Sequence, residues 1–201
     1  MKRVMLLVMI LMTVLITSHA QARSWRIDNN HSQAVFTIRH IAGNVTGFFN
    51  NFEGTIIDPE IPGIGMIDIQ IHVDSINTGV DKRDAHLKTP DFFDSANHPQ
   101  LHFTSTKITN QGDGWFNAHG VLTIRNTNHP ATLTFALTEM TQHPPFPGME
   151  CMDVLGFKAH HTLNRLDFGV GDGKFLQMGL VDNTVGITLQ GELLSPREDC
   201  Q

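Results

Sequence analysis

Apolar and polar residues alternate along most of this chain, and this pattern limits the fold more than any other feature. In residues 67–74, isoleucine or valine at every second position is separated by Asp68, Gln70, His72 and Asp74. Residues 132–138 and 185–193 repeat the pattern. A two-residue period is typical of β-strands that bury one face and expose the other. We therefore expect an all-β protein.

The same reasoning predicts about eight strands. Besides the three runs above, strand-forming residues cover 34–40, 47–57, 101–109, 115–124 and 152–165. Turn-forming residues mark 59–65, 110–114, 126–130 and 169–173. Eight antiparallel strands can close into a barrel that holds packed side chains or one small ligand, and a two-sheet sandwich is the alternative.

One short segment, residues 74–93, departs from the alternation and carries helix signals. Thr78 is followed three residues later by Asp81, which fits a helix start that resembles a capping box. Residues 89–91, Thr-Pro-Asp, fit a second start, with Thr as the N-cap and Pro at the first helical position. The sequence therefore predicts a short helical insertion over residues 78–96.

Charged and aromatic side chains in this insertion allow two interpretations. Arg83, Asp84 and His86 favour solvent, whereas Phe92 and Phe93 favour a core. The insertion is either a lid on one end of the barrel or an ordinary amphipathic connection. In the second case, Arg83 and Asp84 form a surface ion pair of little energetic value.

The N-terminus has the features of a signal peptide. Lys2 and Arg3 precede an uncharged apolar stretch at residues 4–17, and Ala20-Gln21-Ala22 fits a cleavage site. The stretch is short for a membrane anchor, and no later segment has 18 uninterrupted apolar residues. We expect residues 1–22 to be removed and residues 23–201 to form one domain in an exported, periplasmic protein.

Charge narrows the set of partners. The first 22 residues hold two of the 14 basic residues and none of the 20 acidic ones, so the remainder carries a formal charge of about −8. This argues against nucleic acid and anionic membrane surfaces as partners. The pattern leaves the oligomeric state open, and a homodimer is compatible with it.

The insertion resembles that of a known family, the YceI-like proteins. The family pattern there is close to S-I-x-T-G-x-x-x-R-D-x-H-L-x-S-x-D-F-F-D, and this chain has Ser75-Ile76, Thr78-Gly79, Arg83-Asp84, His86-Leu87 and Asp91-Phe92-Phe93-Asp94. Elsewhere the matching residues are His31-Ser32, Phe36, Ile38, His40, Gly47, Phe49, Phe52, Gly54, Pro99, Phe103, Ser105-Thr106, Gly120, Leu122-Thr123-Ile124, Asn164-Arg165 and Asp167-Phe168-Gly169, with a closing strand near Val185. Asn126 departs from the pattern, because the family usually has Gly there, and Cys151 and Cys200 are not part of it.

The resemblance implies a lipocalin-like eight-stranded antiparallel barrel that holds a polyisoprenoid, quinone-like or other lipid-like chain. From alternation alone, a packed interior is the expectation; the resemblance favours a cavity instead. We predict that one continuous tunnel is closed at one end by Phe92 and Phe93, and that Arg83, Asp84 and His86 hold the lid or contact a head group. The predicted ligand-contacting residues are Phe36, Ile38, His40, Phe49, Phe52, Ile69, Ile71, Arg83, Asp84, His86, Phe92, Phe93, Phe103, Leu133, Phe135, Phe157 and Ile187.

Two other functions remain open. His143, Met149, Cys151 and Met152 gather soft ligands that suit Cu(I), although their spacing matches no recognised metal signature. A lipid-acting enzyme would need a constellation that is unmarked in the sequence, since no nucleophile elbow, P-loop or dinucleotide fingerprint occurs. We therefore expect a binding protein without catalytic residues, metal or tightly bound cofactor other than the lipid.

The two cysteines are expected to form a disulfide. Cys151 opens one predicted strand, and Cys200 follows the strand that returns antiparallel to it. Their midpoint lies near Phe175, close to the predicted turn, so both cysteines should lie at the same end of one hairpin. Disulfides persist in exported proteins, whereas the alternative is two independent thiols.

Overall fold

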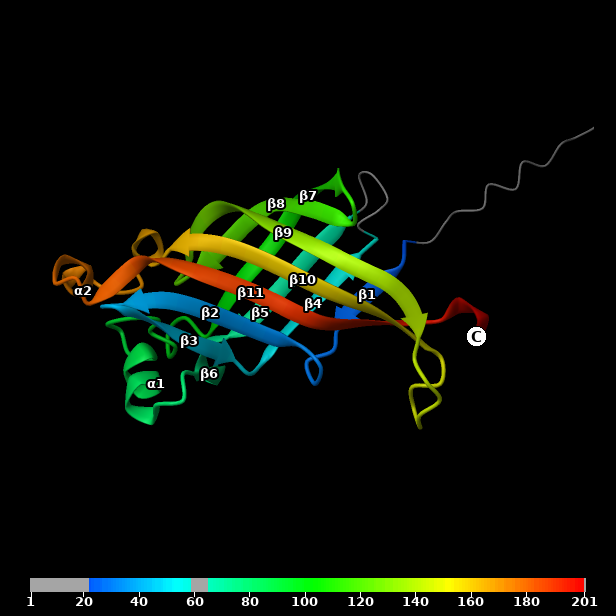
Figure 1. Cartoon of the computed structure of the whole chain (residues 1–201), viewed down its shortest axis with the longest axis horizontal. Coiled ribbons are helices and arrows are strands. Elements are labelled where there is room, and N and C mark those ends of the chain that lie inside the picture. Colours follow the sequence, from blue (N-terminus) through cyan, green and yellow to red (C-terminus); the bar gives the residue numbers. More distant parts are fainter. Residues whose placement is uncertain (1–21, 59–64, 201) are drawn as a thin grey trace, which may run out of the picture.

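The computed structural model describes residues 22–58 and 65–200, which form a closed antiparallel barrel with helical elements at one end (Figure 1). The predicted signal peptide, apart from Ala22, and most of the predicted turn at 59–65 lie outside the described residues. The strands are β1 (Ser24–Ile27), β2 (Gln33–His40), β3 (Gly43–Phe49), β4 (Phe52–Ile57), β5 (Met66–His72), β6 (Ile76–Asn77), β7 (Gln100–Gly112), β8 (Trp115–Ile124), β9 (Thr127–Gln142), β10 (Met152–Asn164) and β11 (Val181–Pro196). The helices are α1 (Asp81–Leu87) and α2 (Lys174–Gln177), with 3-10 turns η1 (Val73–Ser75), η2 (Arg165–Phe168) and η3 (Glu198–Cys200).

The prediction of an eight-stranded barrel is confirmed, although the described part of the chain is divided into eleven strands. β11 pairs with β2 along residues 181–190 and with β1 at Leu193 and Leu194, so β1 and β2 share one position in the barrel. In the same way β3 pairs with β2, and β4 pairs with β1 and β5. The predicted single strand over 47–57 is therefore interrupted after Phe49. Neither the four-residue β1 nor the two-residue β6 was predicted, and β6 pairs with the end of β3.

The break between β1 and β2 is held by a close approach to β11. The Ser32 hydroxyl donates to the Glu192 carbonyl at 3.3 Å and accepts from the Glu192 N–H at 3.1 Å. Gly191 beside it has φ +148°, and a Cβ there would lie 2.2 Å from Ser32 Oγ, so only glycine fits. Within the break, His31 pairs with Asp28 at 2.8 Å, and this hydrogen bond raises the pKa of His31.

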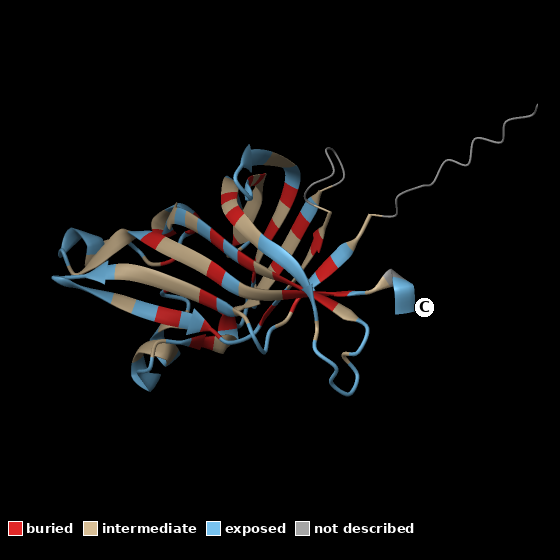
Figure 2. Ribbon diagram, turned by 45° about the vertical axis from the view of Figure 1, so that its right-hand side comes forward, coloured by how far each residue is buried: buried red, intermediate tan, exposed pale blue. Residues whose placement is uncertain are grey.

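Burial alternates along the strands as expected, and Figure 2 shows buried residues recurring along them. The half of the barrel away from α1 and α2 is packed with aromatic side chains. Phe116 and Phe135 stack with ring centroids 5.2 Å apart and are 2% and 1% exposed. Trp25 and Leu193 belong to the same buried cluster.

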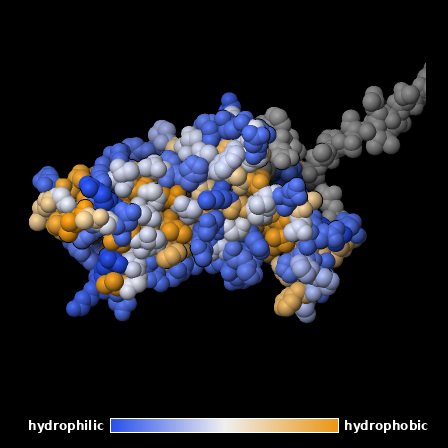
Figure 3. Space-filling view, in the orientation of Figure 1, coloured by the Kyte–Doolittle hydropathy of each residue, from blue (hydrophilic) through white to orange (hydrophobic). Residues whose placement is uncertain are grey.

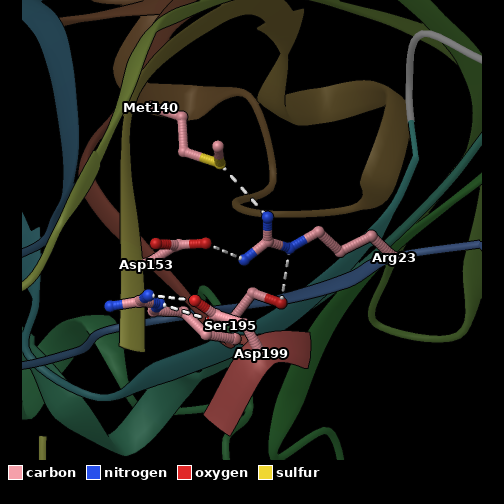
Figure 4. A network of polar contacts seen from close by, with 6 residues as sticks. Arg23, Met140, Asp153, Ser195 and Asp199 are labelled. Atoms are coloured by element: carbon pink, nitrogen blue, oxygen red, sulfur yellow. Dashed lines mark hydrogen bonds and ion pairs between the residues drawn. The ribbon is translucent and has the colours of Figure 1, made fainter. Parts of the chain in front are cut away.

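A polar network ties the N-terminal segment to three strands at this packed end (Figure 4). The Arg23 guanidinium donates to Asp153 on β10 at 2.5 Å and to the Ser195 hydroxyl on β11 at 3.0 Å. It also lies 3.1 Å from the Met140 sulfur on β9 and stacks over the Trp25 ring. Arg23 thus anchors the start of β1 where the barrel closes.

The predicted disulfide is confirmed. Cys151 is bonded to Cys200, with their Cα atoms 5.8 Å apart. The register explains the pairing, because Met152 lies opposite Pro196 and Asn164 lies opposite Thr184 along the β10–β11 hairpin. The bridge therefore fastens the C-terminal turn η3 to the open end of that hairpin.

Both predicted helix starts in the insertion are wrong in detail. α1 begins at Asp81 with Val80 as its N-cap and no side-chain cap, and Thr78 bonds to Asp84 rather than Asp81. Residues 89–91 form turns, not a second helix. Thr89 instead donates its hydroxyl to the His86 carbonyl at 2.8 Å, which closes the end of α1.

The β8–β9 hairpin accounts for the departure at Asn126. Arg125 and Asn126 have φ of +50° and +58°, a left-handed pair that a tight hairpin turn requires. Asn tolerates this conformation better than other residues with a side chain, so it can replace the usual glycine.

Candidate functional site

The barrel has an apolar cavity of about 300 Å³ at the end that carries α1 and α2. Its wall comes from β2, β3, the ends of β7, β8, β10 and β11, the insertion, η2 and α2. This volume lies at the lower end of the usual range for small-molecule sites. The lining residues are Phe36, Ile38, His40, Val45, Phe49, Thr78, Arg83, His86, Leu87, Phe92, Phe93, Leu101, Ile124, Leu163, Arg165, Val170, Phe175, Leu180, Val181, Val185 and Ile187.

A second, smaller cavity of about 70 Å³ lies next to the first, deeper in the barrel. Both cavities are lined by Phe49, Leu101, Ile124, Leu163 and Ile187, so only side chains separate them. Predicted residues Ile69, Ile71, Phe103 and Leu133 line the smaller one. His161 also lines it, and burial lowers the pKa of this histidine, an effect that its 3.0 Å hydrogen bond to the Thr132 carbonyl partly offsets.

Most of the predicted contact residues therefore meet at one end of the barrel, and the expected single tunnel needs correction. Phe36, Ile38, His40, Phe49, Arg83, His86, Phe92, Phe93 and Ile187 line the larger cavity. Phe52, Phe135, Phe157 and Asp84 line neither cavity. The three phenylalanines face inward but belong to the buried core, because other aromatic and aliphatic side chains fill the space around them. The barrel is hollow in one half and packed in the other.

Aromatic contacts close the cavity at the insertion. Phe92 stacks against Phe175 of α2, with centroids 6.2 Å apart, and meets the His86 ring edge-on at 5.0 Å. Phe93 meets Phe49 of β3 edge-on at 6.1 Å. Two consecutive phenylalanines thus bridge the insertion to opposite sides of the cavity, as a lid would.

The charged cluster of the insertion is organised by Thr78. The Arg83 guanidinium donates to the Thr78 hydroxyl at 2.7 Å and to its carbonyl at 2.8 Å. The Thr78 N–H and hydroxyl both donate to Asp84, at 3.0 and 2.5 Å. Arg83 and Asp84 therefore share Thr78 as a partner instead of forming the simple surface ion pair, and they fix α1 to the chain that follows β6.

Sequence reasoning missed the contribution of η2 and α2 to this cavity. Arg165, Val170 and Phe175 line it, together with Leu180, which precedes β11, and Val181, the first residue of β11. Arg165 is only 5% exposed, and burial lowers the pKa of its guanidinium, an effect that Asp172 and Asp182 oppose. The available signal was the Asn164-Arg165 motif, which is among the positions that match the family pattern.

Exposed apolar side chains surround the same end. Ile41, Leu176 and Met178 are 55%, 37% and 66% exposed, and the Ile41 N–H donates to the Leu180 carbonyl at 3.0 Å. Figure 3 shows apolar surface gathered over α2. No helix in the described ranges is long and apolar enough to cross a membrane.

Two groups of side chains contain atoms of the kinds that bind metal ions. Asp28, His31 and Glu192 have ligand atoms within 4.8 Å of one another, and two of the three, Asp28 and His31, are already paired with each other. In the loop proposed for Cu(I), the Cys151 sulfur is bonded to Cys200, and His143 Nδ1 lies 2.7 Å from the Pro144 carbonyl. The loop therefore lacks the thiolate that made it a plausible copper site.

The closed antiparallel barrel, its apolar cavity and the insertion that covers it place this protein among the eight-stranded barrels with a hollow interior. Within this class the chain belongs to the YceI-like family, because residues 25–193 match its YceI-like domain. It is 30% identical over 155 residues to a UPF0312 protein of Yersinia pestis, covering 75% of this chain and 78% of that protein. The Escherichia coli protein YceI matches with the same identity and coverage.

Solved structures share the fold. The crystal structure of BcnA from Burkholderia cenocepacia has a TM-score of 0.72 and 20% identity, covering 84% of this chain and 98% of that one. A structure described as a polyisoprenoid binding domain from Saccharophagus degradans has a TM-score of 0.63 and 12% identity, covering 87% and 99% of the two chains.

Proposed function

We propose that this protein binds a long hydrophobic molecule, a polyisoprenoid or quinone-like lipid, inside the barrel and carries or sequesters it. The observation that supports this most directly is the lidded apolar cavity, which is separated from a second cavity only by side chains that line both. Each methylene moved from water into such a site contributes about 0.8 kcal/mol. Rotation of the shared side chains, Leu101 or Phe49 for example, would join the cavities and accept a longer chain.

The related fold described as a polyisoprenoid binding domain supports the same ligand class. We further propose that the protein is exported to the periplasm after cleavage behind Ala22, which fits the Cys151–Cys200 disulfide. A carrier role rather than catalysis fits a wall made mainly of aliphatic and aromatic side chains.

Mass spectrometry of organic extracts from natively purified protein tests the proposal. We expect about one long-chain lipid per chain in the wild type. Ile187→Asp, which places a charge in the wall of both cavities, should abolish lipid retention because burial of an unpaired carboxylate is costly. Thr188→Asp on the opposite face of β11 is the matched control and should retain lipid. Stoichiometric metal without lipid would instead support the metal-binding alternative.

The lid interpretation predicts a kinetic effect for Arg83. Arg83→Ala removes both bonds to Thr78 and should accelerate release of bound lipid about tenfold, while the free energy of unfolding falls by only about 1 kcal/mol. Release can be followed by transfer of a fluorescent lipid to acceptor vesicles. Lys82→Ala, on the exposed neighbour, should leave the rate unchanged. Equal release rates for the wild type and Arg83→Ala would show that the cluster does not hold the lid.

A further inference from the structure

The polar groups in the larger cavity are biased towards positive charge. Its wall contains Arg83, Arg165, His40 and His86, and among the described residues that line it there is no Asp or Glu. The chain as a whole has a formal charge of −6. A cationic interior in an acidic protein is the reverse of what overall composition predicts, so the bias is local to the cavity.

Among these four side chains, Arg165 is the one with a buried donor that lacks a hydrogen-bond partner in the described part of the chain. Its Nε donates to the Asp182 carbonyl at 2.8 Å and its Nη1 to the Val170 carbonyl at 2.7 Å. Nη2 is shielded from solvent and has no hydrogen-bond partner within the described part of the chain. Burial of a cation with an unused donor is costly, and natural structures rarely tolerate it without a reason.

The neighbouring carboxylates are occupied by other cations. Asp182 pairs with Arg39 at 3.2 Å, and Asp172 pairs with Lys174 at 3.3 Å. Arg165 therefore contacts backbone carbonyls only. Gly171 leaves room for this orientation of the Arg165 side chain, because a Cβ at residue 171 would lie 2.3 Å from Nη1.

A guanidinium with a free donor in an apolar enclosure suits an oxyanion. Planar N–H donors match carboxylate and phosphate oxygens, and such charge-assisted bonds are about twice as strong as neutral ones. The surrounding Phe92, Leu163 and Phe175 would exclude water from the contact and accept the first carbons of an attached chain.

We propose that the cavity selects amphiphiles with an acidic head group, a carboxylate or a phosphate, and that Arg165 donates to that head group through Nη2. This inference rests on the proposed function and adds the ligand's charge and its point of attachment. Arg83, held by Thr78, contributes positive potential at the wall, whereas Arg165 makes the direct contact. Nη2 becomes accessible when the adjacent lid side chains shift.

Competition with one neutral probe tests this on the intact protein. Nile red is displaced at pH 7.5 by four molecules of equal chain length, each below its micelle concentration: dodecanoate, dodecyl phosphate, dodecanol and dodecyltrimethylammonium. We expect the better of the two anions to bind about 10- to 100-fold more tightly than dodecanol, and the cation to bind most weakly. Whether the carboxylate or the phosphate binds better identifies the source of the head group.

Two variants locate the effect. Arg165→Met should reduce affinity for the preferred anion to that for dodecanol, with dodecanol binding unchanged within about twofold. Lys158→Met removes the same charge from an exposed position on β10 and should preserve the preference. Should Arg165→Met fail to fold, Arg165→Lys keeps the charge without the planar donor group and should lose part of the preference.

The outcomes separate the two proposals. Dodecanol binding as tightly as both anions would overturn the head-group inference and leave the lipid-carrier function standing. An anion preference that persists in folded Arg165→Met would overturn the assignment to Arg165. Failure of all four molecules to displace the probe, together with lipid-free native protein, would overturn both.

Discussion

Replacement of Phe135 by alanine is expected to lower the free energy of unfolding by about 3–5 kcal/mol, a large part of the roughly 5–15 kcal/mol that holds a domain together. Phe135 is 1% exposed and stacks on Phe116 in the packed half of the barrel. Its removal leaves a void bounded by strands that are hydrogen-bonded on both sides, so the walls cannot collapse into it. Urea unfolding followed by circular dichroism measures the loss.

Phe93→Ala is the matched control. One side of the Phe93 ring already faces the larger cavity, so its removal sacrifices fewer contacts and should cost only about 1–2 kcal/mol. Equal losses for the two variants would contradict the division of the barrel into a packed half and a hollow half.

Loss of the disulfide is the second large effect that we expect. The bridge joins residues 49 positions apart. In the chain-entropy model, removing a bridge that closes a loop of this size should lower the free energy of unfolding by about 4 kcal/mol. The double variant Cys151→Ser, Cys200→Ser should therefore unfold at a lower urea concentration than the oxidised wild type. The β10–β11 ladder remains intact in this variant, so the barrel itself should persist.

Reduction provides the control for this comparison. A reducing agent should bring the wild type to the midpoint of the double variant and leave the variant unaffected. Thiol titration of the unfolded, unreduced wild type should find no free thiol. Two free thiols per chain would show that the bridge does not form in solution.

Sequence alternation identified the strands because side-chain direction in a strand depends only on parity, which is a local property. The β8–β9 turn and the hairpin that brings Cys151 to Cys200 follow from such local rules, whereas the closed barrel, rather than a sandwich, was what the resemblance to the family implied. The insertion was located for the same reason, since its charged and aromatic residues interrupt the alternation. The prediction of a second helix starting at residues 89–91 was wrong, because turn hydrogen bonds, such as that from the Thr89 hydroxyl to the His86 carbonyl, outweighed the Thr-Pro-Asp signal.

The alternation along a strand could not distinguish inward residues that line a cavity from inward residues that are packed in the core. Phe36 and Phe135 both point inward, yet Phe36 lines the larger cavity and Phe135 is enclosed by Phe116 and its neighbours. Which of these occurs depends on the side chains that meet across the barrel at each level, and these come from strands far apart in the sequence. The unused donor of Arg165 also depends on contacts between distant segments. Asp182 and Asp172 pair with other cations, and backbone carbonyls accept from Nε and Nη1 of Arg165. The sequence by itself thus determined most of the strands and the hairpin that carries the disulfide, because alternation and turn residues are local signals; the short strands β1 and β6 and the break after Phe49 were not predicted. Only the tertiary structure decided which half of the barrel is hollow and which charge lines it, because long-range packing sets both.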